Sequence, residues 1–232
     1  LKEFKKDEFK FVILNDGSTN SRPKFDKPEN ILSIKILNMK INKCHTFCIA
    51  FGIHYVLKNE EFDNLILMDG DGEDRPEELS LLIDKIKEHP NIVVTANRVK
   101  RSEGFVFKFC YLAHKYLTLV FTGQTIKYGN YTCLPKPVVN EMVNEPATWS
   151  SFSGSLAKIV KDKQSIPSER GTRYFGPSKM SFINLLKHSL SIIAVFKITL
   201  LIRSALFLIT YLFLTIEKIS IITLIPVVGV IV

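Results

Sequence analysis

The residues with the clearest chemical potential are the carboxylates of the segment Asp69-Gly70-Asp71-Gly72-Glu73-Asp74. Asp69 and Asp71 stand two positions apart in a glycine-spaced loop, so their side chains can converge on one divalent cation, with Glu73 as a third candidate ligand. Hard cations such as Mg²⁺ and Mn²⁺ prefer oxygen ligands and keep coordination positions open for substrate phosphates. The spacing therefore predicts a Mg²⁺ or Mn²⁺ site that handles a phosphorylated substrate.

Two other interpretations of this loop need consideration. An EF-hand calcium loop requires Gly at its sixth position and Glu at its twelfth, where the chain has Asp74 and Ser80, so this interpretation fails. A solvated turn that caps a helix beginning at Pro76 needs no metal, and it remains open as the structural alternative.

Basic residues that could bind phosphate occur in two places. Arg98 and Arg101 follow an apolar run, and Arg173 and Lys179 lie in a later basic segment. Guanidinium forks and an ammonium group near a metal site suit a substrate rich in phosphate. Ordinary surface charge, or attraction to a membrane, is the alternative for each of them. No nucleic-acid-binding motif is present, so we expect no nucleic-acid partner.

Alternating strand and helix patterns position these residues. Apolar runs of strand length lie at 9–14, 31–37, 64–68 and 91–96, and helix-period patterns lie at 42–58 and 76–87. This alternation predicts an α/β domain with a largely parallel sheet. Because ligands bind outside the carboxyl ends of parallel strands, the loop at Asp16 and the loop at 69–74 should face one crevice.

The composition indicates a globular domain with an apolar tail. The 232 residues include 31 Lys and Arg against 23 Asp and Glu, a net charge of +8, and 46% are hydrophobic, which excludes a disordered or fibrous chain. From residue 192 onward the charged residues are Lys197, Arg203, Glu217 and Lys218. The four cysteines form no Cys-x-x-Cys pair, so we expect reduced thiols and neither a disulfide framework nor a zinc site.

Three segments follow from these patterns. Residues 1–180 form the predicted catalytic domain, and 181–203 has the period of an amphipathic helix at a membrane surface. Residues 204–232 hold two apolar runs, each shorter than the roughly 20 residues of a spanning helix, and predict one or more transmembrane segments. The preceding basic stretch predicts a catalytic domain on the cytoplasmic side. A buried core helix is the alternative for the tail.

Five segments of the chain occur in an order that is familiar from one enzyme family. They are Asn15–Asn20, Asn42–Gly52, Asp69–Glu77, Arg98–Arg101 and Arg173–Lys179. In turn they resemble the D-D-G-S-x-D loop, the N-x-G-x-x-x-A-(I/L)-x-x-G helix, the D-A-D-L-Q-D-P-P-E signature, a paired-arginine segment and an R-x-x-G-x-S-K motif. Together these resemble family 2 glycosyltransferases of the GT-A fold, in the polyprenyl-phosphate branch that includes dolichyl-phosphate mannose synthase and bacterial undecaprenyl-phosphate sugar transferases.

The resemblance implies a donor site. Asp16 would contact the base or ribose of a nucleotide sugar, and Asp69 and Asp71 would hold the metal and the donor diphosphate. Glu73 stands where the family has Gln, and it would add a third carboxylate to the metal.

The resemblance also implies a set of residues around the phosphates. Arg98, Arg101 and Arg173 would gather the phosphates of donor and acceptor, and with Asp71 they form the predicted catalytic set. Ser178 and Lys179 would bind the donor and help to close the site.

The implied reaction is transfer of a sugar from a UDP- or GDP-sugar to a polyprenyl phosphate, with inversion, at the cytoplasmic face of a bacterial inner membrane. A family 2 enzyme with another acceptor, such as a polysaccharide or an envelope glycan, is one alternative. Processive relatives carry a Q-x-x-R-W motif, and Trp149 is not in one. An inactive membrane-bound scaffold is a second alternative, and homo-oligomer formation is left open.

The chain departs from the family pattern at several points. The family's first strand, with its P-x-Y-N-E stretch, is absent, so we expect part of the nucleotide pocket to lie outside this chain. Cys44 replaces the helix glycine, and Pro177 replaces an acidic residue. Asn130 stands where many relatives carry Asp, and it is therefore left out of the predicted catalytic set.

Overall fold

The computed structural model describes residues 7–18, 31–100, 105–174, 176, 182–218 and 220–231. The chain divides into two compact units. The first unit comprises residues 1–102 and 127–179, and the second comprises 103–126 and 180–232. Residues 103–126 therefore belong with the C-terminal part of the chain, although no sequence pattern separated them from the predicted catalytic domain.

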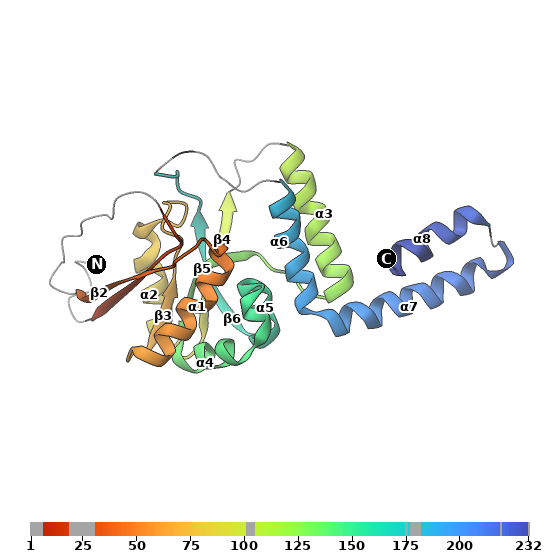
Figure 1. Ribbon diagram of the computed structural model, residues 1–232. Helices are drawn as coiled ribbons and strands as arrows, with labels where there is room; N and C mark the ends of the chain where they lie inside the picture. Colours follow the sequence, from red (N-terminus) through yellow and green to blue (C-terminus); the bar gives the residue numbers. More distant parts are fainter. Residues whose placement is uncertain are drawn as a thin grey trace. The chain divides into compact units, whose positions relative to one another are not determined.

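The first unit contains two sheets with flanking helices (Figure 1). The smaller sheet pairs β1 (Phe9–Asn15) with β2 (Ile31–Asn38) in parallel. The larger sheet has four strands in the order β3 (Asn64–Leu67), β5 (Tyr128–Pro135), β4 (Val93–Lys100) and β6 (Lys163–Glu169). The predicted α/β class is thereby confirmed.

Strand β5 is the exception to the predicted parallel arrangement, since the other three strands of the larger sheet share one direction. β4 and β6 are parallel, but β5 lies between β3 and β4 and is antiparallel to both. Asn97 near the end of β4 faces Tyr128 at the start of β5, so the chain leaves and re-enters the sheet at the same edge. A return to the same edge requires an antiparallel strand, whereas a parallel strand would need a crossover.

Helices cover both faces of the four-stranded sheet. They are α1 (Cys44–Asn59), α2 (Leu79–Glu88) after the 3₁₀ turn η1 (Pro76–Glu78), α4 (Lys136–Asn144), η2 (Pro146–Trp149) and α5 (Phe152–Ile159). Val93 and Leu134 pack with residues of α1, α4 and α5, whereas Val94 and Cys133 pack with α2. Because adjacent strand residues point to opposite faces, these two clusters are the two sides of one core.

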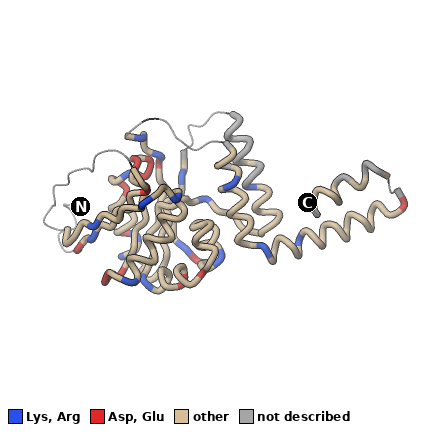
Figure 2. Tube along the Cα trace, viewed as in Figure 1, with Lys and Arg blue, Asp and Glu red and all other residues tan. Residues whose placement is uncertain are grey.

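The second unit is helical. Its elements are α3 (Phe105–Thr122), α6 (Phe182–Val195), α7 (Lys197–Thr215), η3 (Ile216–Lys218) and α8 (Ile221–Ile231). Figure 2 shows few charged residues along these helices. α7 has 19 residues and a mean hydropathy of 1.9, and by length and composition it is able to cross a membrane. The helix break lies at Phe196, so α7 runs through the predicted boundary at Arg203.

Cys44 begins α1 in a strained backbone conformation. Its φ of 70° lies in the left-handed region, which glycine adopts freely and which costs other residues about 1–2 kcal/mol. The helix was predicted to begin at residue 42, and the left-handed turn at Cys44 delays its start. The glycine of the resembling motif falls at this strained position, which gives a physical reason for that glycine.

We therefore expect Cys44→Gly to raise the free energy of unfolding by about 0.5–1 kcal/mol, because relief of backbone strain exceeds the added entropy of the unfolded chain. Thermal unfolding should show a midpoint about 1–4 °C higher. Cys44→Ala is the matched control, since it removes the thiol and keeps the Cβ. A midpoint for Cys44→Gly at or below that of Cys44→Ala would contradict the assignment of strain.

Candidate active site

The loop that follows β3 is held in shape by its own carboxylates. The Asp69 amide donates to Asp74 Oδ2 at 2.9 Å, and the Glu73 amide donates to Asp71 Oδ1 at 2.9 Å. Gly72 has a φ of 91°, and a Cβ there would lie 2.9 Å from the carbonyl oxygen of Thr172. The loop thus folds back on itself at a position that only glycine suits.

Asp74 supports this loop from the interior. It is 4% exposed, and burial is the main reason that its pKa is raised to about 6. Arg98 Nη2 lies 3.6 Å from Asp74 Oδ1, so this predicted phosphate-binding arginine does stand beside the acidic loop. The chain therefore places Asp69, Asp74 and Arg98 in one cluster of contacts.

A segment after β6 docks directly on the acidic loop. The Gly171 amide donates to the Glu73 carbonyl and the Tyr174 amide donates to the Asp71 carbonyl, both at 2.9 Å. A Cβ on Gly171 would lie 2.1 Å from the carbonyl oxygen of Gly72, so the two backbones touch. We call residues 170–174 the docking segment.

Glu73 is the side chain that joins the two loops. It is 9% exposed, and its carboxylate accepts hydrogen bonds from the Arg170 guanidinium and from Arg173 Nε at 2.7 Å. Arg173 also reaches Asp71, with 3.0 Å between Nη2 and Oδ2. Burial alone would raise the pKa of Glu73, but the two arginines outweigh it and hold that pKa below its usual value.

The geometry bears on the predicted metal ligands. In the part of the chain that the structure describes, no three His, Cys, Asp or Glu side chains group together to hold a metal ion. Glu73 binds two arginines, whereas Asp71 is paired with Arg173 through Oδ2 and Asp69 with Asn130 through Oδ1, and Asp69 and Asp71 stay the predicted carboxylate pair. Two carboxylates with substrate phosphates are a common ligand set for Mg²⁺, so the donor chemistry of the pair fits the predicted ion.

Sequence reasoning missed several residues of this cluster. Asn130 Nδ2 donates to Asp69 Oδ1 at 3.3 Å, because antiparallel β5 begins at the edge where β3 ends. Glu78 accepts the Ser168 hydroxyl at 2.6 Å and the Glu169 amide at 2.9 Å, which fixes the end of β6 beside η1. The family resemblance does indicate position 130 as a site residue, but Asn130 is outside the predicted catalytic set because many relatives carry Asp at this position.

Asp16 is organised by a different element. Its carboxylate accepts the Lys43 amide at 2.7 Å, and its carbonyl accepts Asn42 Nδ2 at 3.0 Å. Burial, and then a hydrogen bond to Asp16, raise the pKa of the Cys48 thiol to about 12. These contacts tie Asp16 to the start of α1, and its role in donor binding stays a prediction. Arg101, Ser178 and Lys179 lie outside the described residues.

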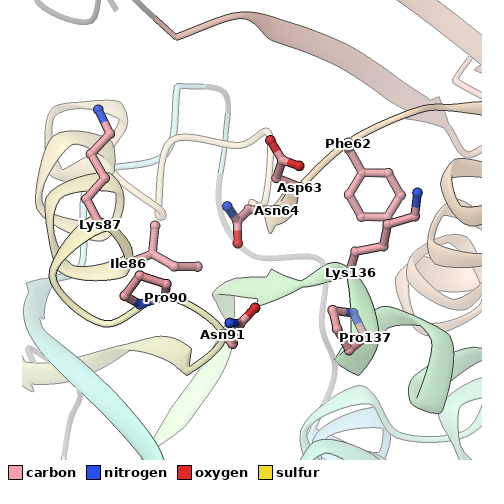
Figure 3. Close-up of a pocket in the computed structure, with 9 residues that line it drawn as sticks. All are labelled: Phe62, Asp63, Asn64, Ile86, Lys87, Pro90, Asn91, Lys136 and Pro137. Atoms are coloured by element: carbon pink, nitrogen blue, oxygen red, sulfur yellow. The ribbon is translucent and has the colours of Figure 1, made fainter.

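The pocket in Figure 3 lies at the other end of β3. Its volume is 540 Å³, and it is lined by residues that include Asn64 at the start of β3, Asn91 before β4 and Lys136 at the start of α4. None of the predicted site residues lines it. The placement of the chemistry at the acidic loop, beyond the carboxyl end of β3, stays a prediction.

Comparison with known proteins identifies the family. Residues 1–136, more than half of the chain, match the model of the glycosyl transferase family 2. The chain belongs to this family. It is 26% identical over 183 residues to an uncharacterized glycosyltransferase of Synechocystis, across 76% of this chain and 56% of that protein. It is 24% identical over 207 residues to the uncharacterized glycosyltransferase YkcC of Bacillus subtilis, across 82% and 59%.

The chain spans less than two thirds of the length of these two relatives. The predicted resemblance to family 2 is confirmed, and the polyprenyl-phosphate branch stays a prediction.

Removal of the Glu73 carboxylate should destabilise the first unit. We expect Glu73→Ala to lower the free energy of unfolding by about 1–3 kcal/mol, because it leaves two arginines without their shared acceptor. Glu77→Ala is the control, since Glu77 is exposed and lies 3.7 Å from Arg75, a pair that should contribute less than about 1 kcal/mol. Equal stability of the two variants in denaturant titrations would show that the docking segment does not depend on Glu73.

Proposed function

We propose that this chain is the catalytic part of a membrane-attached, inverting glycosyltransferase. It transfers a sugar from a UDP- or GDP-sugar to a polyprenyl phosphate at the cytoplasmic face of the membrane. The observation that carries the proposal is the Asp69–Asp71 pair in a family 2 domain, with Arg98 and Arg173 in contact with the same loop.

The donor would bind at the acidic loop. Asp69 and Asp71 would hold a Mg²⁺ or Mn²⁺ ion, which supplies positive charge to the leaving diphosphate when it is bound. Asn130 holds Asp69 by its Oδ1, which restricts the orientation of that carboxylate. Asp16 would bind the nucleoside, and Ser178 and Lys179 would close over the donor.

The acceptor would be the nucleophile. An oxygen of the polyprenyl phosphate forms a bond to the anomeric carbon while the bond from that carbon to the nucleoside diphosphate breaks, which inverts the configuration. The acceptor phosphate is already anionic at neutral pH, so the reaction needs orientation and charge compensation more than a strong base. Arg98, Arg101 and Arg173 would supply that compensation.

The contacts of Arg173 hold its guanidinium in position to compensate phosphate charge. Nε is held by Glu73 and Nη2 lies on Asp71, so the guanidinium is fixed beside the predicted metal carboxylates. A guanidinium held on one edge keeps N–H groups for a phosphate on another. The apolar helix α7 is an argument for a lipid acceptor, because a membrane-spanning helix would keep the active site at the bilayer where a lipid substrate resides.

The test uses the full-length protein in nanodiscs with Mn²⁺ or Mg²⁺, undecaprenyl phosphate and a panel of UDP- and GDP-sugars. We expect a glycosyl lipid by mass spectrometry with one donor. Asp71→Asn should reduce its formation about a hundredfold or more, because it removes a ligand charge at the diphosphate. Asp84→Asn, an exposed carboxylate of α2, should leave the rate unchanged.

The other outcomes separate the alternatives. Metal-dependent binding of a nucleotide sugar without lipid product would point to a different acceptor. Absence of nucleotide binding in the wild-type protein would contradict the proposal that the chain is an enzyme and would favour an inactive membrane-bound scaffold. Full activity of Asp71→Asn would remove the acidic loop from the mechanism.

A further inference from the structure

In the part of helix α3 whose side chains the structure describes, apolar residues are exposed and two threonines are buried. Five large hydrophobic side chains are between 44% and 68% exposed, namely Leu112, Tyr116, Leu117, Leu119 and Val120. Thr118 and Thr122 are only 3% and 4% exposed, and the Thr122 hydroxyl donates to the Thr118 carbonyl. This is the reverse of a helix on a water-soluble protein, which turns its polar face outward.

The same helix lies beside the apolar helices of the tail. α3 packs against α6 and α7 within the second unit, and Figure 1 shows α3 and α6 side by side. On α6, Ile183 and Leu190 are 63% and 55% exposed, beside the exposed polar residues Asn184 and Lys187. Exposed apolar residues thus occur on three helices that pack on one another, and clustered exposed apolar residues mark an interaction site.

Arg203 locks α3 to α7. This arginine is the only charged residue between Ile198 and Ile216, and its Nη1 donates to the carbonyls of Leu119 at 3.2 Å and Val120 at 2.8 Å. The Leu119 carbonyl also accepts the Gly123 amide at 2.8 Å, and the carbonyls of the last turn carry the negative end of the helix dipole. Two carbonyl groups at the end of α3 thus accept hydrogen bonds from the charged guanidinium of Arg203 in α7.

Gly123 makes room for this contact. It ends α3 with a φ of 74°, and a Cβ at this position would lie 2.7 Å from Arg203 Nη2. The left-handed φ favours glycine at this helix end, and the Arg203 guanidinium occupies the space beside it.

We infer that α3 is a membrane-embedded element whose outward face contacts lipid, held there by Arg203. The inference rests on the proposed membrane attachment through α7. Arg203 stands six residues into α7, about 9 Å along the helix from its first residue, Lys197. If α7 enters the bilayer from Lys197, the end of α3 must follow Arg203 below the headgroups, because an unpaired arginine is costly there.

The charges of these helices favour a bilayer as the occupant. Residues 105–126 and 182–216 contain no Asp or Glu, while Lys108, Lys115, Lys187, Lys197 and Arg203 are basic. Basic residues without acidic ones suit the anionic headgroups of a cytoplasmic leaflet. Tyr116, at 68% exposure, has the amphipathic ring that gathers at the membrane interface.

The test places single tryptophans on the full-length protein in a Trp149→Phe background. Leu112→Trp and Tyr116→Trp report on α3, Phe213→Trp reports on α7, and Leu81→Trp of α2 is the control in the first unit. Each variant is reconstituted into vesicles of phosphatidylcholine and phosphatidylglycerol, with or without bromine on the acyl chains. Bromine quenches tryptophan only on contact, so the loss of emission reports lipid contact directly.

We expect the two α3 probes to lose emission to an extent comparable with Phe213→Trp, while Leu81→Trp is unchanged. If Phe213→Trp is quenched and either α3 probe is not, the inference is overturned, whereas the proposed membrane attachment through α7 stands. Quenching of none of the three would overturn the attachment itself. Blue-shifted but unquenched α3 probes would mean that protein, such as a second copy, covers the face, which also overturns the inference.

The role of Arg203 is tested in the same vesicles. Arg203→Leu should leave Phe213→Trp quenched and reduce the quenching of both α3 probes, because the donor to the α3 carbonyls is lost. Arg203→Lys, which keeps a charged donor, should retain more of the quenching than Arg203→Leu. Unchanged quenching of the α3 probes in Arg203→Leu would overturn the assigned role of Arg203.

Discussion

The ion-pair network of Glu73 is the interaction on which the rest of the candidate site depends. The buried Glu73 carboxylate binds Arg170 and Arg173, which come about one hundred residues later in the chain. Arg173 also forms an ion pair with Asp71. The charges are compensated, so the carboxylate remains ionised despite its burial. Two backbone hydrogen bonds, from the Gly171 and Tyr174 amides, join the docking segment to the same loop.

This network has a consequence for the chemistry. Glu73 holds the Arg173 guanidinium close to Asp71 before any substrate binds. The site thus combines carboxylates that can bind a metal ion with a guanidinium that can bind a phosphate. Preorganised charges of both signs suit a reaction that separates a diphosphate from a sugar, because little reorganisation is needed during the reaction. The second unit is nearly free of acidic residues and would keep such a site beside a lipid substrate.

The local features of the fold could be predicted from the sequence, and the long-range ones could not. The strands before Asp16 and Asp69, the helix start at Pro76 and the apolar tail follow from periodicity and turn residues. The position of Asn130 depends on the direction of β5, which no local pattern encodes. The Arg170–Glu73 and Arg203–Leu119 contacts join distant segments, so the sequence showed the charges without their partners.

The central claim is that Glu73 builds the donor site by fixing the docking segment, and a double-mutant cycle tests it most directly. Calorimetry would measure Mn²⁺-dependent binding of the nucleotide sugar to wild type, Glu73→Gln, Arg170→Gln and the double variant. We predict that each single change weakens binding roughly tenfold or more and that the double variant binds no more weakly than the worse single one. Strictly additive losses, or unchanged binding in Glu73→Gln, would contradict the claim.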